Sequence, residues 1–342
     1  MNKKILLVGW GYPPKIDGGL DIAVKELFEG LESRNVDVDL MLPAERAPDR
    51  ENVVPVKVEG DMFSKAEQLS RAAAEKASEY DLIHTNDWFG VEAGFKASKY
   101  QDVKWVSSFH SLSSTRNRSP EPRLEKLERV GAEKADHVTA VSQRLANQVE
   151  KRYGRIPRVI YNGFSRPESS DKSLEFESPS FFFVGRHSSQ KGIEHLIYGF
   201  KKFREKNSEG KLVIGGTGHM KKSFEDFVEI LGIGEHVLFE GFIPEEDLEA
   251  YYRAADVFVS PSVEEPFGLT ISEALNSGTK VVCTDSGINE LLQPEALTLV
   301  EPDSDSIVEG LEEALEKDLP EFEKRSWNKM VEEYIQLYRG LS

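Results

Sequence analysis

Two segments of the chain carry charged residues in an order that suits the binding of an anion such as a phosphate group. The first, FFFVGRHSSQKG at residues 181–192, is an apolar run followed by Gly185, Arg186 and Lys191. The apolar run predicts a buried strand, which places both cations at or just beyond its carboxyl end. Ligands of open parallel sheets bind at that end of the strands, so position favours an anion site over ordinary surface charges.

The second segment, SPSVEEPFGLTISEA at residues 260–274, places two glutamates around the start of a predicted helix. Glu265 lies in the loop before this helix and Glu273 lies near its first turn, so we expect them at different depths of one pocket. The backbone N–H groups of residues 268–270 would be unpaired and would favour a phosphate. Taken alone, the segment equally fits an ordinary helix start whose acidic residues are favoured by the helix dipole.

A glycine pair, Gly18 and Gly19, follows the first predicted strand and opens a helix. It allows a ligand to approach the backbone closely, and the helix start again favours an anion. The surrounding sequence lacks both GxGxxG and GxxxxGK[ST], so it supports neither a dinucleotide fingerprint nor a P-loop. A further glycine-rich stretch, residues 215–218, is interpreted as a tight turn with close packing.

Two histidines end predicted strands and are candidates for contact with a substrate. His110 follows the strand at residues 105–109, and His84 belongs to the polar stretch DLIHTNDW at residues 81–88. Each also fits a histidine that is satisfied within the core. His110 has the stronger position, because its strand end is expected to face the ligand-binding edge and a polar loop follows it.

The sequence offers no recognisable transition-metal site. It contains no HExxH, no CxxC and a single cysteine, Cys283, which is expected to be a buried thiol. The Asp-x-Asp pair at residues 37–39 fits the solvent face of a strand, and the pair at residues 303–305 fits a helix N-cap. Neither pair is interpreted as a ligand of a divalent metal.

Composition and charge limit the class of protein. The chain has 342 residues, 39% of them hydrophobic, and a formal net charge of −17, which argues against a nucleic-acid binder. Residues 1–165 carry 25 basic and 25 acidic residues, whereas residues 166–342 carry 18 and 35, as expected of two units with different surfaces. The first apolar run, residues 5–8, is too short for a signal peptide or a membrane span, so a cytoplasmic location is expected.

Short apolar runs alternate with segments of helical period along the chain, which predicts two α/β domains with doubly wound parallel sheets. The Ser- and Pro-rich segment at residues 165–180 is predicted to be the linker between the two domains. The predicted boundaries are 1–165 for the first domain, 166–326 for the second and 327–342 for a last amphipathic helix. The predicted strands are at residues 5–8, 36–42, 82–84, 105–109, 137–141, 159–160, 181–184, 212–214, 237–239, 257–260 and 280–283.

Together these segments resemble the retaining GT-B glycosyltransferases of family four, also called glycosyltransferase group 1, with some similarity to glycogen and starch synthases. The resemblance covers nearly the whole chain. Its most specific part is the pair Glu265 and Glu273 within EPFGLTISEA, combined with Gly-Arg and Lys-Gly upstream. It is also carried by PPKIDGGL, DLIHTNDW, SSFH, ADHVTAVS, VIYNGF, VLFEGFIP and SEALNSG.

The resemblance implies a GT-B fold, with two Rossmann-like domains that face each other across a cleft, and the last helix packed back on the first domain. It implies that the second domain binds the donor, a nucleotide-diphosphate sugar, while the first binds the acceptor. Arg186, Lys191, Glu265 and His110 would be the catalytic residues: the two cations hold the diphosphate, Glu265 contacts the transferred sugar, and His110 lies beside the sugar ring. The further residues that it implies at the donor are Gly18, Gly19, Gly185, Phe242, Ile243, Phe267, Gly268, Leu269, Thr270 and Glu273, and those on the acceptor side are His84, Asn86, Asp87 and Trp88.

Within this family, Glu273 would take the ribose hydroxyls, Phe242 and Ile243 would border the base, and Gly18 and Gly19 would approach the diphosphate. The resemblance implies no metal and no cofactor, and partners limited to a UDP-, GDP- or ADP-linked sugar and a carbohydrate or lipid-linked acceptor. A nucleotide-sugar epimerase, a phosphorylase and an inert carbohydrate-binding relative remain as alternatives. Five basic residues between positions 115 and 130 permit at most a peripheral contact with the inner face of a membrane.

Overall fold

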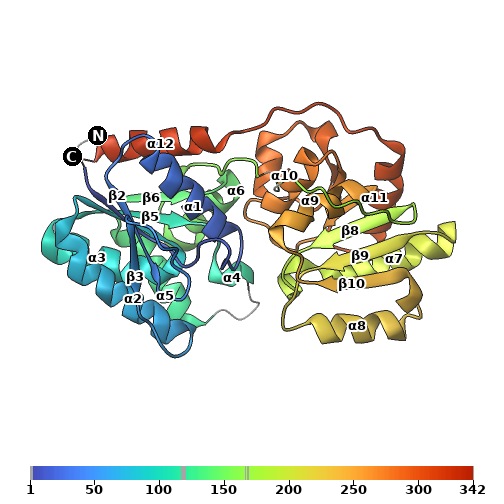
Figure 1. Cartoon of the computed structure of the whole chain (residues 1–342), viewed down its shortest axis with the longest axis horizontal. Coiled ribbons are helices and arrows are strands. Elements are labelled where there is room, and N and C mark those ends of the chain that lie inside the picture. The colour runs from blue at the N-terminus through green and yellow to red at the C-terminus, as the bar shows by residue number, and fades with distance from the viewer. Residues whose placement is uncertain (1–2, 117–120, 166, 168, 342) are drawn as a thin grey trace. The chain divides into compact units, whose positions relative to one another are not determined.

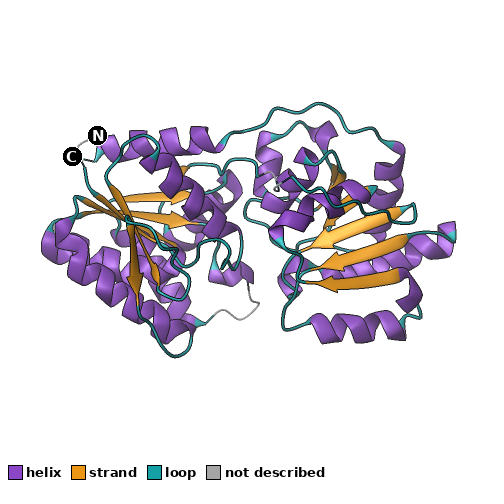
Figure 2. Cartoon of the chain, in the orientation of Figure 1, coloured by secondary structure: helices purple, strands orange, loops and turns teal. Residues whose placement is uncertain are grey.

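The computed structural model describes residues 3–116, 121–165, 167 and 169–341, which divide into two compact units (Figure 1). Unit 1 comprises Met1–Gly163 and Arg325–Ser342, and unit 2 comprises Phe164–Lys324. In each unit, helices cover both faces of one sheet, as Figure 2 shows by colour. Every strand pair is parallel, which confirms the α/β class with doubly wound parallel sheets.

In the described part of unit 1, the sheet has the order β3-β2-β1-β4-β5-β6-β7. Its strands are β1 (Ile5–Val8), β2 (Val38–Pro43), β3 (Val53–Val56), β4 (Leu82–Asn86), β5 (Lys104–Phe109), β6 (His137–Ala140) and β7 (Arg158–Val159). Its helices are α1 (Gly19–Glu32), α2 (Met62–Lys76), α3 (Val91–Gln101), α4 (Ser113–Arg116), α5 (Pro122–Lys134), α6 (Gln143–Tyr153) and α12 (Trp327–Gly340), with short 3-10 turns η1 (Ala77–Glu79) and η2 (Asp87–Gly90).

In the described part of unit 2, the sheet has the order β10-β9-β8-β11-β12-β13. Its strands are β8 (Ser180–Val184), β9 (Lys211–Gly215), β10 (Val237–Gly241), β11 (Val257–Ser260), β12 (Lys280–Cys283) and β13 (Thr298–Leu299). Its helices are α7 (Ile193–Asn207), α8 (Lys221–Ile230), α9 (Glu245–Ala254), α10 (Leu269–Asn276) and α11 (Ser304–Glu316), with 3-10 turns η3 (Ser189–Lys191), η4 (Gly234–His236), η5 (Gly287–Leu291) and η6 (Pro294–Ala296).

The strands β1 (ILLV) and β8 (SFFFV) lie in the middle of their sheets and are buried on both faces, which explains their apolar runs. In β8, Phe181 and Phe183 join the core beneath α7 and α11, while Phe182 points the other way. There it packs on Tyr251 and Tyr252 of α9, at centroid distances of 5.6 and 5.4 Å. Each face of the sheet thus has its own core, and removing either ring would leave a cavity.

The last helix, α12, packs on α1 within unit 1 (Figure 1). The two helices approach closely at Gly30, where a Cβ atom would lie 2.4 Å from the side chain of Val331. The start of α12 is held by Arg325, whose guanidinium donates to the carbonyl oxygen of Tyr161 at 3.2 Å and to Glu333 at 2.6 Å. Chain segments from the two ends of the sequence therefore form one core.

Most predicted elements are confirmed within one to three residues, and the two missed strands have clear reasons. The sequence of β3, VVPV, contains Pro55, which argues against a strand in the middle of a sheet. This strand lies at the edge of the sheet, where a missing N–H is tolerated. The strand β13 has only two residues and gives no periodic signal. The predicted N-cap is confirmed: Asp303 accepts from the N–H groups of Asp305 and Ser306.

Candidate active site

Two loops of unit 2 begin at adjacent strands where the strand order reverses. The chain runs outward from β8 to β9 and β10, then returns to place β11 on the other side of β8. The segments that leave β8 and β11 at their carboxyl ends, residues 185–192 and 261–268, therefore start side by side. This reversal point is where open α/β sheets bind ligands.

Three consecutive contacts join these two loops. The carbonyl oxygen of Gln190 accepts from the N–H of Val263 at 2.8 Å, and its side-chain Nε2 donates to the carbonyl oxygen of Glu264 at 3.0 Å. One residue further along both loops, Lys191 Nζ donates to Glu265 Oε2 at 2.6 Å. The structure thus brings together Lys191 and Glu265, two of the residues that the sequence singled out.

The Lys191–Glu265 pair is partly buried, with side-chain exposures of 25% and 13%. Ser262, itself buried, supplies a second donor to Glu265 Oε2 at 3.3 Å. A hydrogen bond between two ionised groups is short and strong, and partial burial reduces its screening by water. The carboxylate of Glu265 is therefore held in a fixed place beside a fixed positive charge.

A glycine allows the two loops to meet. Gly192 has a φ of +62°, and a Cβ atom there would lie 2.1 Å from the carbonyl oxygen of Pro261. The loop after β9 packs just as closely, since a Cβ on Gly216 would lie 2.0 Å from the carbonyl oxygen of Gly185. Residues 215–218 therefore form the closely packed turn that the sequence predicted.

Gly185 and Arg186 lie at the carboxyl end of β8, and the Arg186 side chain is exposed. Gly185 is fixed by its N–H, which donates to the carbonyl oxygen of Gly215 at 3.3 Å. Arg186 and Lys191 therefore lie on the same loop, Arg186 near its start and Lys191 near its end. The arrangement puts two cations at one edge of the sheet.

Helix α10 starts at the end of the second loop. Gly268, with a φ of +104°, precedes Leu269 and Thr270 in its first turn, and Phe267 is buried. The N–H of Ile288 donates to the carbonyl oxygen of Phe267 at 2.8 Å and ties this turn to η5. The helix start, with its unpaired N–H groups, therefore lies at the same carboxyl edge as Lys191 and Glu265.

Glu273 lies one turn further along α10 and is partly buried. Its Oε2 accepts a hydrogen bond of 2.9 Å from the hydroxyl of Tyr252 on α9. Burial raises the pKa of Glu273 to about 7; the Tyr252 hydrogen bond lowers it and the charge of Glu245 raises it. This carboxyl group titrates near neutral pH, a property that clusters at functional sites.

Phe242 and Ile243 follow β10 at the edge of the sheet. Phe242 is 74% exposed, whereas Ile243 is buried against Gly215 at the end of β9. An aromatic ring so exposed has gained little from burial, so its apolar surface is available to a ligand.

In unit 1, the strand order also reverses, between β1 and β4. Gly18 and Gly19 are exposed at the start of α1, after the loop that leaves β1. The loop is held by Asp21, a buried residue whose carboxylate accepts from the N–H of Asp17 at 2.7 Å. Burial raises the pKa of Asp21 to about 6.

His110 lies at the carboxyl end of β5, and residues from the end of β4 hold it. Its Nε2 lies 3.1 Å from Asn86 Oδ1, while Asn86 Nδ2 donates to the carbonyl oxygen of Val8. With the amide so oriented, Nε2 of His110 must carry the proton. Asp87 accepts from the backbone N–H of His110 at 2.7 Å and from Ser111.

The residues at the end of β4 and just after it therefore differ from the prediction that they face an acceptor. Asn86, Asp87 and Trp88 are each at most 5% exposed. Two of them fix His110, and Trp88 packs on Phe63 and Phe89. Their effect on a substrate would pass through His110 and the loop that follows it.

His84 needs a clearer correction. It is fully buried, its Nδ1 lies 2.6 Å from the hydroxyl of Tyr338, and its Nε2 lies 2.6 Å from Ser108 Oγ. Ser108 in turn contacts Thr139, and both lie within 3.2 Å of the hydroxyl of Tyr334. Both ring nitrogens are engaged beneath α12, so His84 joins this helix to the sheet and does not contact an acceptor.

The burial of His84 yields a prediction about stability. Burial lowers its pKa to about 3, well below the value of about 6.5 of an unfolded chain. Its contribution to the free energy of unfolding is therefore complete above pH 6.5 and is lost as the pH falls toward 3. Between pH 7.5 and 5 we expect a loss of about 2 kcal/mol from this residue.

Urea unfolding followed by tryptophan fluorescence measures this effect, since all four tryptophans lie in unit 1. Asp21 acts in the opposite direction over this range, because its raised pKa favours the folded state at lower pH. The informative quantity is therefore the difference between the wild type and His84→Asn, with exposed His137→Asn as control. The prediction is wrong if His84→Asn loses as much stability on acidification as His137→Asn.

The structure adds positioning residues that the sequence did not single out: Gln190, Ser262, Tyr252 and Asp21. Gln190 adjoins Lys191 along the chain, and this adjacency was the only available signal. Ser262 and Tyr252 act on glutamates through contacts that form only on folding. Their residue types are common, so no pattern in the sequence marked them.

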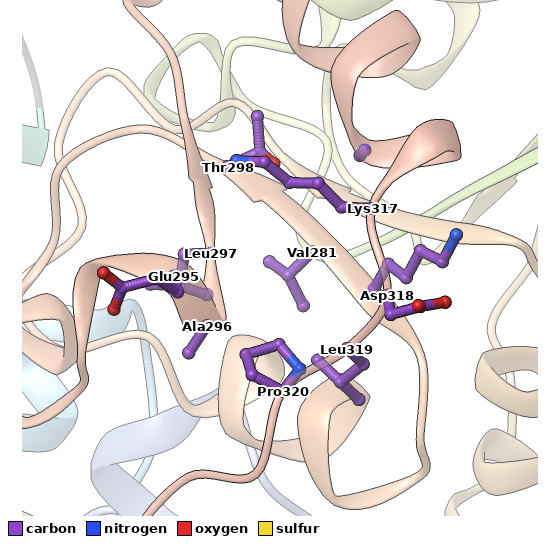
Figure 3. A pocket seen from close by; sticks show the side chains of 11 residues that line it. Val281, Glu295, Ala296, Leu297, Thr298, Lys317, Asp318, Leu319 and Pro320 are labelled. Atoms are coloured by element: carbon purple, nitrogen blue, oxygen red, sulfur yellow. The ribbon is translucent and has the colours of Figure 1, made fainter.

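Several hollows in the described part of the chain lie away from these loops, and two of them show the range of their sizes. One, shown in Figure 3, has a volume of about 10 Å³, about the space for a single water molecule, and is lined by Val281, Leu297 and Pro320 among others. It adjoins Lys280, at the amino end of β12, whereas the candidate site lies at the carboxyl ends. The other, of about 370 Å³, lies between α3 and α5, and Glu92, Phe95, Lys96, Arg123 and Lys126 are among the residues that line it.

This larger hollow includes part of the basic segment noted in the sequence, of which Arg118 lies outside the described residues. Within the residues that the structure describes, no cluster of three or more His, Cys, Asp or Glu side chains could hold a metal ion. The same part of the chain contains no helix of the length and apolarity that crossing a bilayer demands. Cys283 is buried, as predicted.

Two units, each built on a parallel sheet with helices on both faces, are the domain type of the GT-B fold. Comparison with known proteins makes this specific. Residues 165–332 match the family model "Glycosyl transferases group 1", and residues 17–166 match "Glycosyltransferase Family 4". The chain belongs to the glycosyltransferases of group 1, or family 4, and is an enzyme of that class.

Individual proteins agree with the family. An uncharacterized glycosyltransferase of Methanocaldococcus jannaschii is 31% identical, over 98% of both chains. Among solved structures, sucrose-phosphate synthase from Thermosynechococcus elongatus superposes with a TM-score of 0.80 at 23% identity, over 99% of both chains. The Anabaena protein HepE, solved in complex with UDP and glucose, superposes with a TM-score of 0.76 at 18% identity, over 99% of this chain and 100% of HepE. These two structures share the fold.

Proposed function

We propose that this glycosyltransferase moves a sugar from a nucleotide-diphosphate sugar to a hydroxyl group of an acceptor, with retention of the anomeric configuration. The observation that carries the proposal is the Lys191–Glu265 pair, at 2.6 Å, on two loops that meet at the strand reversal of unit 2. A cation beside a carboxylate offers one group for a diphosphate and one for sugar hydroxyls. The complex of HepE with UDP and glucose supports a donor of this chemistry.

The charges suit the departure of a diphosphate. When the bond between the anomeric carbon and the phosphate oxygen breaks, its electron pair goes to the oxygen and negative charge builds there. Arg186, Lys191 and the backbone N–H groups at the start of α10 would stabilise that charge. Fixed donors of this kind act on the transition state more than on the ground state.

Retention is proposed to follow attack on the same face that the diphosphate leaves. The acceptor oxygen forms its bond to the anomeric carbon, and its proton passes to the departing phosphate oxygen. Glu265 would bind hydroxyls of the transferred sugar near the reacting carbon, held in place by Ser262. His110, protonated on Nε2, would lie beside the sugar ring.

The rest of the donor is assigned to three regions. Glu273 would accept the ribose hydroxyls, and Phe242 and Ile243 would border the base. Gly18 and Gly19, exposed at the start of α1, would approach the diphosphate. Gly185, Phe267, Gly268, Leu269 and Thr270 would line the donor through their backbone.

No metal or other cofactor is proposed to take part. Two cations on one loop supply the charge that a divalent ion supplies in metal-dependent transferases. The acceptor is assigned to unit 1. Any contact with a membrane is proposed to be peripheral: Lys96, Arg123 and Lys126 line the hollow between α3 and α5, and each cation adds only about 1 kcal/mol near an anionic surface.

Calorimetric titration with UDP-, GDP- and ADP-glucose tests the proposal. One of them should bind, and EDTA should leave both its affinity and transfer to a panel of acceptors unchanged. A ligand at 100 times its dissociation constant stabilises a protein by about 2.7 kcal/mol, so thermal unfolding gives a second readout.

The alternatives give different results in the same experiment. Isomerisation of the donor without an acceptor indicates an epimerase, and a requirement for phosphate indicates a phosphorylase. Binding without turnover across the acceptor panel indicates an inert carbohydrate-binding relative. Activity that EDTA abolishes and Mg²⁺ restores would overturn the proposed role of the two cations.

A further inference from the structure

Tyr252 is a buried tyrosine whose hydroxyl reaches one of the proposed donor-binding residues. It is 0% exposed, and its hydroxyl donates to Glu273 Oε2 at 2.9 Å. Burial raises the pKa of this phenol well above 10, so it stays protonated and acts as a donor throughout the neutral range. A carboxylate oxygen is the acceptor that it needs.

The tyrosine has little freedom to move. Its ring packs edge-on against Phe182 and Phe258, at centroid distances of 5.4 and 5.2 Å. Its carbonyl oxygen accepts a hydrogen bond of 2.6 Å from the hydroxyl of Thr279, at the turn between α10 and β12. Because both the ring and the backbone of Tyr252 are held, its hydroxyl has a fixed position and can hold the side chain of Glu273 in place.

The contact affects both the direction and the charge of Glu273. Because Oε2 is directed at Tyr252, the carboxyl group has one defined orientation, with Oε1 left for a ligand. Burial raises the pKa of Glu273 to about 7, and the hydrogen bond from Tyr252 opposes that rise. A hydrogen bond to the charged form of a carboxyl group favours that form.

The surroundings of Glu273 identify Tyr252 as the group that favours ionisation. Of the described charged groups, Glu245 on α9 also acts on Glu273, and it raises the pKa. The other elements packed against α10 carry Lys280 and Cys283 on β12 and Glu290 on η5, none of which is among the main influences on this pKa. Strand β11, VFVS, carries no titratable group.

We propose that Tyr252 is a positioning residue for donor binding, which holds Glu273 ionised and oriented so that it accepts the ribose hydroxyls. This inference rests on the proposed function, since it takes Glu273 as the ribose ligand. A neutral carboxyl group accepts fewer hydrogen bonds than a carboxylate, so binding strengthens as Glu273 loses its proton. Removing the Tyr252 hydroxyl moves that proton loss to higher pH.

The test is the dissociation constant of a nucleoside diphosphate, measured by calorimetry between pH 6 and 9 for wild type, Tyr252→Phe and Tyr251→Phe. UDP, GDP and ADP are tried in turn, and the tightest is kept. Tyr251 is a matched control, because it adjoins Tyr252, packs on the same Phe182 and is not bonded to Glu273. Phenylalanine keeps the ring, so both variants should unfold thermally near the wild type.

The expected result is a loss that depends on pH. Tyr252→Phe should bind about fivefold to eightfold more weakly than wild type at pH 6.5 to 7, as a rise of one unit in the pKa of Glu273 from about 7 requires. The ratio should return toward one at pH 9, and Tyr251→Phe should follow the wild type throughout. Equal affinities at every pH, or the same loss at every pH, would overturn the inference.

A third variant, Glu273→Ala, separates this inference from the proposed function. If no nucleoside diphosphate binds the wild type, or if Glu273→Ala binds as tightly as the wild type, then the assigned role of Glu273 is wrong. If Glu273→Ala binds weakly while Tyr252→Phe shows no pH-dependent loss, the role of Glu273 stands and that of Tyr252 is wrong.

Discussion

Replacing Lys191 with alanine is expected to lower kcat by about 100-fold to 1000-fold, the loss that follows removal of one fixed donor to a developing negative charge. Lys191 Nζ lies 2.6 Å from Glu265 Oε2, in the loops that follow the carboxyl ends of β8 and β11. The leaving diphosphate is proposed to bind there. The alanine variant cannot stabilise that charge, and it also leaves Glu265 without its cation. Steady-state transfer rates with the identified donor measure the effect.

A surface lysine provides the matched control. Lys222 on α8 is ion-paired with Asp226 of the same helix, and its side chain is 78% exposed, so Lys222→Ala removes a paired ammonium that is not bonded to Glu265. It should keep full activity. Because Lys191→Ala leaves the partly buried carboxylate of Glu265 without its cation, some loss of thermal stability is also expected, so transfer rates are compared below the unfolding temperature of the variant. Full activity in Lys191→Ala would show that its positive charge does not stabilise the leaving group.

Replacing Gly192 with alanine is expected to separate the two loops that carry Lys191 and Glu265. A Cβ atom at this position would lie 2.1 Å from the carbonyl oxygen of Pro261, a distance that the backbone must relieve by moving. Overpacking of this kind costs about 1–3 kcal/mol or more, beyond the cost of a positive φ for alanine. Activity should fall at least as far as in Lys191→Ala, and unit 2 should lose stability.

A second variant, Gly154→Ala, separates the effect of the close contact with Pro261 from the cost of a positive φ. Gly154 has a φ of +69°, close to that of Gly192, but nothing within 4 Å of where a Cβ would lie. Gly154→Ala should therefore show only the backbone cost, about 1–2 kcal/mol, with normal activity. If Gly192→Ala were as active and as stable as Gly154→Ala, the close approach of the two loops would not be needed for the site.

The local pattern of the sequence was sufficient to predict most of the elements. A short apolar run, such as ILLV in β1 or VFV at the start of β11, is best buried in a parallel strand covered on both faces, and both strands were predicted to the residue. The same reasoning placed Arg186 and Lys191 at a strand end, because a loop must follow where the apolar run stops. It failed at β3, where Pro55 contradicts a central strand, since local pattern does not say which strand lies at an edge.

By itself, then, the sequence determined two α/β units, their strand ends and the charged residues in the loops that follow. Only the tertiary structure decided which loops meet: Lys191 and Glu265 are 74 residues apart along the chain, and the strand order of unit 2 joins them. His84 shows the same limit. The alternation of residues along β4 says which side chains share a face of the strand, but not which helix packs on that face. The face of His84 is covered by α12, whose Tyr338 lies 254 residues away along the chain. Periodicity is a local property, whereas the choice of neighbouring elements depends on how the whole chain buries its apolar faces.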